Sequence, residues 1–483
     1  MKRDGKNLYI DGEWRVGGNT RAFDIVNPAN ETTIGELSLS DHSDLNDAVS
    51  AAQKGFLEWR DVSPQERGRV LKNIAASLTD RKRELATVMT QEQGKPLAEA
   101  IGEMDRTIET FEWCGEEATR TYGRVYPQRA TGMRQVTIKQ PIGPVAAFSP
   151  WNFPAVLSAR KIAPALAAGC SIVIKPAEET PGVCIGMFEA LAEAGVPPGV
   201  ANLVFGEPEK VSKHLLSASE IKKVSLTGST AVGRDLMRLS ADGLINATME
   251  LGGHAPVLVF NDTDAEKAAE MTAIFKYRNA GQVCLAPSRV YVHKDVMDKF
   301  VRRYVEISRD FRVGDGLDPA SQMGPLANER RMAATLRLVE DVKDKGGKIV
   351  CGGDRVGNTG YFVAPTVVVD VAANADVMMT EPFGPILAIS EFSDFDQAIS
   401  LANASPFGLA AYAFTESVAT ATAFADRIDA GWIGINNFSP FLADVAGGGM
   451  KKSGIGYEGG TEGMDAYFHT KFVSQTSLAP IVT

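Results

Sequence analysis

Hydrophobic positions in the first quarter of the chain recur at the spacing of a helix that buries one face. The pattern predicts helices within residues 40–120 and is clearest in Leu45–Trp59 and Glu66–Thr90. From residue 143 onward, short apolar segments alternate with helical ones. The segments predicted to be strands are Val145–Ser149, Ile172–Lys175, Ala201–Phe205, Lys223–Thr227 and Thr248–Leu251. This alternation indicates a parallel, doubly wound sheet whose strands end at one common edge, where a nucleotide can bind.

A second alternating series follows residue 255. A helix is predicted over Asp295–Phe311, and the predicted strands are Val257–Phe260, Ser288–Val292, Lys348–Cys351 and Ile386–Phe392. The predicted fold class is therefore α/β, with two doubly wound domains, of which the first is Rossmann-like.

Two further segments, Gly123–Gln140 and Ala466–Thr483, are β-prone and lie outside these regular series. We expect them to form a small β extension that leaves the body of the protein and pairs with another subunit, because an unpaired strand edge invites pairing. The alternative is an exposed hairpin and a frayed tail.

Composition narrows the choice of partners and compartment. The chain has 483 residues and a formal net charge of -10, which argues against a nucleic-acid or anionic-membrane partner. The N-terminus lacks the apolar segment of a secretory signal, and no run of about 18 apolar residues occurs, so a cytoplasmic location is predicted. The five cysteines are widely spaced and the histidines scattered, which favours neither a disulfide framework nor a metal site.

Three short segments supply the side chains that acyl chemistry needs. Gly281–Cys284 places a thiol after a helical segment, Met249–Gly253 places Glu250 at the end of a strand, and Pro150–Pro154 places Asn152 after another strand. A thiolate is a nucleophile, a carboxylate is a base, and an amide donates hydrogen bonds to an oxyanion. A lone cysteine is more often a small buried apolar residue, so the combination predicts catalysis where the thiol alone does not.

Taken in this order, the three segments resemble the aldehyde dehydrogenase superfamily, and the resemblance runs from about residue 8 to the C-terminus. Further matching motifs are Ile174–Pro181, Leu226–Gly233 and Glu381–Pro385. Within the superfamily, Gln91–Leu97 and Phe275–Gly281 most resemble the succinate-semialdehyde and α-ketoglutarate-semialdehyde dehydrogenases.

The resemblance implies a reaction through a covalent intermediate. Cys284 would attack the aldehyde carbonyl, and Asn152 together with the backbone N–H of Cys284 would hold the oxyanion. Glu250 would activate the water that hydrolyses the resulting thioester. Lys161 and Glu458 would help to relay the proton, and the alternative for each is a solvated charge.

The resemblance also implies a cofactor site. The residues that would bind the cofactor are Trp151, Lys175, Glu178, Gly228, Ser229, Gly233, Glu381 and Phe383. We expect NAD to be preferred and NADP to be the second choice, because the Glu178 carboxylate bonds to ribose hydroxyls and repels a 2′-phosphate. The segment Gly228–Gly233 departs from the usual dinucleotide fingerprint, and a core position is the alternative for Trp151.

The predicted domains follow from this division of roles. An NAD-binding domain is expected in residues 1–122 and 142–251, and a catalytic domain in 252–440. Oligomerisation strands are expected in 123–141 and 466–483, which would assemble a homodimer or homotetramer.

The substrate is expected to be a small aldehyde with a carboxylate, such as succinate, glutarate or α-ketoglutarate semialdehyde. Arg160 and Arg278 stand where semialdehyde dehydrogenases bind a carboxylate, and structural ion pairs are the alternative for both. The loop Phe438–Asp444, which contains Phe441, lacks the serine that succinate-semialdehyde enzymes place beside the substrate carboxylate, which leaves a bulkier or aromatic aldehyde open. A coenzyme A-acylating dehydrogenase and a non-catalytic homologue are further alternatives. Glu250 argues against the first, and the intact set of three residues argues against the second.

Overall fold

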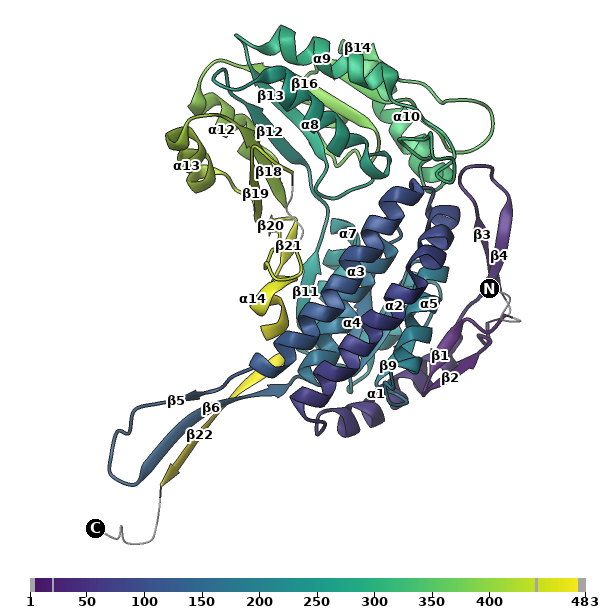
Figure 1. Ribbon diagram of the computed structural model, residues 1–483, viewed down its shortest axis with the longest axis vertical. Coiled ribbons are helices and arrows are strands. Elements are labelled where there is room, and N and C mark those ends of the chain that lie inside the picture. The colour runs from purple at the N-terminus through teal and green to yellow at the C-terminus, as the bar shows by residue number, and fades with distance from the viewer. Residues whose placement is uncertain (1–4, 20, 439–441, 477–483) are drawn as a thin grey trace.

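The computed structural model describes residues 5–19, 21–438 and 442–476. Figure 1 shows two α/β bodies arranged along the long axis and a narrow β arm that projects from one of them. Each body is built around its own sheet. The predicted fold class, with two doubly wound α/β domains and a small β extension, is confirmed.

The first body contains an eight-stranded sheet in the order β2-β1-β9-β8-β7-β10-β11-β21. In that order the strands span Glu13–Arg15, Leu8–Ile10, Ala201–Leu203, Ile172–Lys175, Val145–Phe148, Lys223–Thr227, Asn246–Glu250 and Gly454–Ile455. The five strands from β9 to β11 run parallel, and the outer strands pair antiparallel. The chain order reverses between β7 and β10, and ligands of open α/β sheets bind at such a switch point.

Seven helices of this body flank the sheet. They are α1 (His42–Trp59), α2 (Pro64–Gln93), α3 (Leu97–Glu117), α4 (Pro154–Ala168), α5 (Pro181–Glu193), α6 (Pro208–Ser217) and α7 (Thr230–Asp242). Helix α2 begins where the Ser63 side chain accepts a hydrogen bond from Glu66 N, and it ends where Gly94 adopts a φ of 96°. Helix α4 is buried along its whole length and packs against α3, α2 and α5. Its polar side chains therefore lie inside the protein.

The second body contains a seven-stranded sheet in the order β14-β15-β16-β13-β12-β18-β19. In that order the strands span Lys348–Cys351, Thr366–Val369, Ile386–Phe392, Pro287–His293, Ala255–Val259, Ala410–Phe414 and Trp432–Ile435. All neighbouring pairs are parallel except β14 and β15. Its helical segments are α8 (Ala265–Tyr277), η2 (Arg278–Gly281), α9 (Met297–Asp310), α10 (Glu329–Asp344), α11 (Asp376–Met379), α12 (Phe395–Asn403) and α13 (Val418–Arg427).

The projecting arm is a three-stranded sheet of β5 (Arg124–Val125), β6 (Met133–Pro141) and β22 (Phe468–Thr476). Strand β22 pairs antiparallel with β6 from Phe468 opposite Pro141 to Thr476 opposite Met133. Both β-prone segments thus form strands that leave the body, and here they pair with each other. Strand β22 is an edge strand within the described residues, and its Phe472 side chain is 57% exposed. Pairing of the arm with another subunit stays a prediction.

The remaining elements are short. They are the hairpin β3 (Ala22–Val26) and β4 (Thr33–Ser38), the pair β17 (Phe407–Gly408) and β20 (Met450–Lys451), η1 (Ala118–Arg120) and α14 (Gly460–Asp465). Strand β21 shows that the chain returns to the first sheet after the second body, where the sequence pattern predicts no strand. None of the helices in the described ranges has the length and hydropathy needed to cross a membrane.

Candidate active site

The parallel strands of the first sheet deliver most of the candidate residues to one edge. Strand β8 ends at Lys175 and β11 at Glu250, while Asn152 follows β7 and Gly228 follows β10. Parallel strands present their carboxyl ends on the same side, so residues far apart in the chain meet there.

The chain passes from the first sheet to the second through Leu251–His254. Gly253 in this crossing has no room for a side chain, because a Cβ atom would collide with the carbonyl oxygen of Cys284. Its backbone N–H donates to Glu381 Oε1 at 3.0 Å. The crossing therefore packs the end of β11 directly against the segment that carries the thiol.

Cys284 lies at the wall of a pocket between the two bodies. It follows a turn in which Asn279, Ala280 and Gly281 all adopt left-handed φ values of 51°, 52° and 72°. The pocket has a volume of about 170 Å³ and is largely apolar. Its lining includes Cys284, three phenylalanines and two arginines, namely Phe153, Phe275, Phe438, Arg106 and Arg278.

The electrostatic surroundings of Cys284 disfavour its thiolate in the free protein. Burial raises the pKa of the thiol most, and the carboxylates of Glu250 and Glu381 raise it further. Backbone N–H groups of Cys284 and Leu285 act in the opposite direction. The thiol therefore needs a neighbouring base to become a nucleophile.

Glu250 has the properties of such a base. Its carboxyl is buried, and its Oε1 atom has no hydrogen-bond partner among the described residues. Burial raises the pKa of Glu250 and the Glu458 carboxylate raises it further, whereas Arg160 and Lys161 lower it. A carboxylate whose pKa is raised toward neutrality is well matched to proton transfer near pH 7.

Lys161 and Glu458 form a buried ion pair next to Glu250. Lys161 Nζ lies 2.6 Å from Glu458 Oε1 and also donates to Thr227 Oγ1 at 2.8 Å. The side chains are 0% and 4% exposed, so neither residue is the solvated charge that the sequence left open. Arg160 and the pair are close enough to shift the pKa of Glu250.

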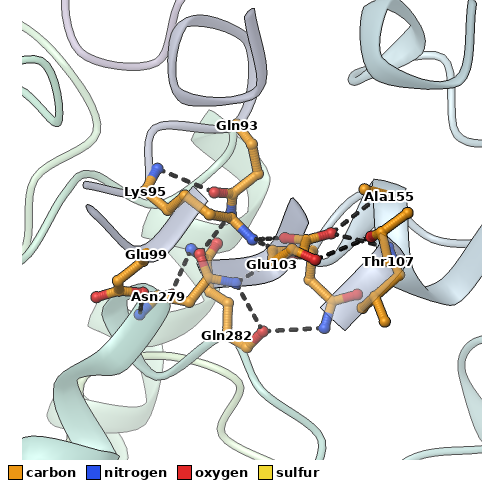
Figure 2. A network of polar contacts seen from close by, with 10 residues as sticks. Gln93, Lys95, Glu99, Glu103, Thr107, Ala155, Asn279 and Gln282 are labelled. Atoms are coloured by element: carbon orange, nitrogen blue, oxygen red, sulfur yellow. Dashed lines mark hydrogen bonds and ion pairs between the residues drawn. The ribbon is translucent and has the colours of Figure 1, made fainter. Parts of the chain in front are cut away.

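Asn152 is held by contacts from both bodies. Its peptide oxygen accepts hydrogen bonds from Lys95 Nζ at 2.7 Å and from Asn279 Nδ2 at 2.9 Å. Its Nδ2 donates to the carbonyl oxygen of Gln282 at 3.0 Å, two residues before the thiol. Figure 2 shows the labelled partners around this contact, among them Lys95 with Glu103 and Asn279 with Gln282. An amide nitrogen carries two hydrogens, so the second one is available to an oxyanion.

The residues expected to bind the cofactor form two groups. Trp151 and Phe383 meet edge to face with ring centroids 5.5 Å apart, next to the Glu381 segment. Burial raises the pKa of Glu381 to about 7. At the other end of the switch point, Lys175 Nζ lies 2.6 Å from Glu178 Oε1, and Gly206 N donates to the same oxygen at 3.1 Å.

The N-terminus of α7 fits a dinucleotide phosphate. Gly228 and Ser229 lead from β10 into this helix, and the Ser229 side chain caps it by accepting from Val232 N at 3.3 Å. Gly233 allows α7 to pack against Leu251, whose side chain a Cβ atom would hit. Ser229 and Val232 are exposed, which leaves the positive end of the helix dipole open to an anion.

The structure separates the two arginines that the sequence assigns to the substrate. Arg278 lines the Cys284 pocket, with its guanidinium 5.4 Å from the centre of the Phe153 ring. Arg160 does not line this pocket. It donates through Nη2 to the carbonyl oxygen of Leu442 at 3.0 Å and lines a small cavity beside Glu458. Phe441 lies outside the described residues.

Sequence reasoning missed several residues of the pocket. Arg106 reaches it from α3, and Phe153, Phe275 and Phe438 form aromatic walls. The rings of Phe275 and Phe438 are stacked at 4.9 Å. Phe153 directly follows Asn152, and this adjacency is the one signal that could have identified an aromatic wall from the sequence.

Comparisons with known proteins agree with this geometry. The profile of the aldehyde dehydrogenase family matches residues 14–473. The 4-(hydroxymethyl)benzenesulfonate dehydrogenase of Comamonas testosteroni is 44% identical over 466 residues, which cover 96% of this chain and 97% of that protein. The NADP-dependent succinate-semialdehyde dehydrogenase of Escherichia coli strain K12 is 39% identical and covers 98% of this chain and 99% of its own length.

A solved structure extends the comparison to the fold. The betaine aldehyde dehydrogenase of Staphylococcus aureus, in complex with NAD+, superimposes with a TM-score of 0.96 at 32% identity, covering 99% of this chain and 96% of that one. The chain therefore belongs to the aldehyde dehydrogenase family, as its motifs predict. Its class of activity is the oxidation of an aldehyde, and succinate- and glutarate-semialdehyde dehydrogenases are among its relatives.

Proposed function

We propose that the protein oxidises an aldehyde that carries an acidic group to the corresponding carboxylic acid, with Cys284 as the nucleophile. The observation that carries the proposal is that Cys284 and Arg278 line one largely apolar pocket. A substrate whose anionic end is bound by the guanidinium can present its aldehyde carbon to the thiol from within the same pocket.

The first half of the reaction forms a bond between Cys284 sulfur and the carbonyl carbon. Glu250 takes the thiol proton, and the thiolate adds to the carbonyl, whose electron pair moves to oxygen. Asn152 Nδ2 and the Cys284 N–H donate to this oxyanion. NAD, which Trp151, Glu381 and Phe383 would hold beside this pocket, would supply the hydride acceptor that turns the adduct into a thioester on Cys284.

The second half of the reaction breaks the carbon–sulfur bond. Glu250 takes a proton from the attacking water, and the cysteine sulfur leaves as the acid is released. The buried Lys161–Glu458 pair next to Glu250 provides the onward path for the proton. Because Glu250 can activate water, its presence favours water, and not coenzyme A, as the acceptor of the acyl group.

The first candidate substrate is a small carboxylated semialdehyde, such as succinate, glutarate or α-ketoglutarate semialdehyde. Within the described residues, Arg278 has neither a hydrogen bond nor an ion pair with a protein carboxylate, although Glu99 is near enough to interact electrostatically. A half-buried guanidinium in an apolar wall is favourable only when an anion compensates it. Arg106 at the same pocket adds a second guanidinium, which is paired with Glu109 at 2.6 Å.

The second candidate is an aromatic aldehyde with a sulfonate or carboxylate group. Three phenylalanine rings line the pocket, and its volume is about 170 Å³. An apolar cavity of about 150 Å³ is large enough to hold benzene, so an aromatic ring fits here. The relative that is 44% identical is named for a benzenesulfonate, which points in the same direction. Both candidates place the anion at Arg278 and differ in what fills the apolar part.

For the cofactor we propose NAD, bound by the first body, with NADP as the second choice. In this proposal residues 1–122 and 142–251 form the NAD-binding domain, and 252–440 form the catalytic domain. Glu178 stands near the expected position of the adenosine ribose, where its carboxylate repels a 2′-phosphate. The ion pair with Lys175 weakens that repulsion, so residual use of NADP is expected.

We also propose a homodimer or homotetramer assembled through the arm in residues 123–141 and 466–483. The arm has little core of its own, since every residue of β22 after the first is exposed. Its exposed Phe472 and Val125 side chains, together with the outer edge of β22, are suited to a second copy of this chain.

The test compares charged and uncharged aldehydes in the parent and in arginine variants. We expect kcat/KM for succinate semialdehyde or 4-sulfobenzaldehyde to exceed that for butanal or benzaldehyde by about ten- to hundredfold, as for a charge-assisted hydrogen bond. Arg278→Ala removes most of this ratio, and Arg106→Ala removes part of it. Within the charged pair, the preferred compound distinguishes the two candidate substrates.

Two controls accompany the test. Arg302→Ala changes an arginine whose side chain is 62% exposed and paired with Glu266, so the ratio is expected to stay as in the parent. Arg160→Ala is expected to lower the rates for charged and uncharged aldehydes alike, because Arg160 lies outside the pocket. A parent ratio near one, or an unchanged ratio in Arg278→Ala, rejects the anionic-aldehyde proposal.

A further inference from the structure

A buried ion pair that the proposed reaction does not use lies beside the active site. Lys95 Nζ is 2.6 Å from Glu103 Oε2, and both side chains are 0% exposed. Lys95 follows the end of α2, and Glu103 lies on α3. Burying two charges costs about as much free energy as their attraction returns, so stability alone does not account for the pair.

The ammonium of Lys95 holds the peptide of Asn152. It donates to the Asn152 carbonyl oxygen at 2.7 Å and lies 4.0 Å from the centre of the Phe153 ring. Asn279 Nδ2 donates to the same oxygen at 2.9 Å. One peptide oxygen is thus bound by a donor from each body, and Asn279 belongs to the left-handed turn before Cys284.

The carboxylate of Glu103 fixes the start of α4. Its Oε1 accepts from Ala155 N at 2.9 Å and from Val156 N at 3.2 Å (Figure 2), while the residue at the N-cap, Phe153, provides no capping side chain. Free N–H groups at a helix start need an acceptor, and Glu103 supplies it. The same carboxylate orients Lys95, so the pair fixes α4 and the peptide just before it together.

We propose that Lys95 and Glu103 are positioning residues that set the Asn152 side chain for its contact with the oxyanion. The inference rests on the proposed function, in which Asn152 donates to that oxygen. One Nδ2 hydrogen of Asn152 is already directed at Gln282 O, so the direction of the other depends on where the Asn152 peptide is held. Lys95 acts through Asn152 and touches neither the thiol nor Glu250 within the described contacts.

The experiment measures the pre-steady-state burst of NADH, which reports formation of the thioester before its hydrolysis. Lys95→Met frees the Asn152 peptide, and we expect the burst rate to fall about ten- to hundredfold, as for a displaced oxyanion donor. The KM for NAD is expected to stay near that of the parent. Because Glu103 lines the substrate pocket, the burst is measured with butanal as well as with succinate semialdehyde, and both are expected to slow equally.

A double-mutant cycle separates positioning from general destabilisation. If Lys95 acts through Asn152, then Lys95→Met slows the parent but adds nothing in an Asn152→Ala background. Lys95→Met leaves Glu103 buried without its cation, so Lys95→Met/Glu103→Gln is prepared as well. The glutamine keeps an acceptor for Ala155 N, and this neutral pair is expected to fold and to show the same slow burst.

Arg67→Met is the matched control, because Arg67 is buried and binds the other end of α4 through the Ala167 carbonyl oxygen at 3.0 Å. We expect this control to lower the melting temperature and to leave the burst rate unchanged. The rate of Cys284 alkylation by iodoacetamide is expected to be the same in the parent and in Lys95→Met, since that reaction forms no oxyanion at the site of attack.

A burst rate in the neutral double variant equal to that of the parent overturns the inference. The inference is also overturned if Lys95→Met slows the burst in the Asn152→Ala background by the same factor as in the parent. Failure of the proposed function is a different result, because then the parent forms no NADH with any of these aldehydes or Cys284→Ala forms it at the rate of the parent.

Discussion

Substitutions in the Lys161–Glu458 pair test whether these two charges set the pKa of Glu250, the proposed base. Glu458→Gln removes a negative charge that raises the pKa of Glu250, and it leaves the Lys161 cation, which lowers that pKa. The substitution therefore lowers the pKa of Glu250. Glu250 therefore stays deprotonated, and able to act as a base, to a lower pH than in the parent. The acid limb of turnover is expected to move to lower pH.

The size of the shift follows from the general effect of one charge on a nearby carboxyl. A charge within about 4–6 Å shifts a carboxyl pKa by about 1–3 units. In the parent, Lys161 Nζ lies 2.6 Å from Glu458 Oε1. The glutamine amide keeps an oxygen at this position, so we expect the local geometry to persist. We expect a shift of about one unit, which corresponds to about 1.4 kcal/mol.

Lys161→Met gives the opposite sign. It removes a cation that lowers the pKa of Glu250, so the acid limb moves to higher pH. It also leaves Glu458 buried and unpaired, which is expected to cost about 3–5 kcal/mol of stability. The opposed directions make the two variants controls for each other.

The assay is kcat against pH at saturating aldehyde and NAD, with folding checked by near-UV circular dichroism. Glu270→Gln serves as the surface control, since Glu270 pairs with Arg303 at the surface, where the two side chains are 44% and 36% exposed. Acid limbs that move in the same direction in Glu458→Gln and Lys161→Met, or that stay where they are in both folded variants, refute the assignment of Glu250 as the base that limits turnover.

Three further predictions concern the cofactor, stability and assembly. Glu178→Gln removes the carboxylate that repels a 2′-phosphate and is expected to raise NADP efficiency relative to NAD by about tenfold; an unchanged ratio of kcat/KM contradicts this. Burial raises the pKa of Glu92 to about 8. The folded protein therefore keeps a proton on Glu92 at pH values where the unfolded chain, with the ordinary pKa of a glutamate, has already released it. The stability from that proton is present at low pH and lost as pH rises through about 8, and the melting temperature of Glu92→Gln should therefore decline less with pH than that of the parent. Light scattering at micromolar concentration is expected to give the mass of two or four chains, and a persistent monomer rules out assembly through the arm.

The pattern of hydrophobic positions predicts the sheets well because parallel strands are buried on both faces. Ile172–Lys175 begins with three apolar residues, whereas Lys223–Thr227 alternates polar and apolar residues; both form strands, β8 and β10, with the predicted bounds. Glu250 was expected at a strand end and is the last residue of β11. Strand β21 is only two residues long, and its place in the first sheet depends on a return of the chain that no local pattern encodes.

The site is predicted less completely because its contacts are long-range. Arg160 lies on the fully buried helix α4 and donates to the carbonyl oxygen of Leu442, a contact between residues 282 positions apart that no local pattern indicates. Arg106 and Lys95 are charged residues in or next to helices, where a solvated face is the ordinary interpretation. Lys95 contacts Asn152 across 57 residues of chain, a separation that only the folded structure reveals.

The most direct test of the central claim is the mass of the peptide that contains Cys284 after a single turnover. Glu250→Gln is mixed with NAD and the preferred aldehyde, quenched in acid, digested and analysed for the peptide that contains Cys284. The account predicts that the thioester still forms, more slowly than in the parent because Glu250 no longer takes the thiol proton. It accumulates because its hydrolysis lacks the same base, with one acyl group on Cys284 for each NADH released. NADH release from Glu250→Gln with no acyl group on Cys284, or an equal adduct and NADH yield in Cys284→Ala, contradicts it.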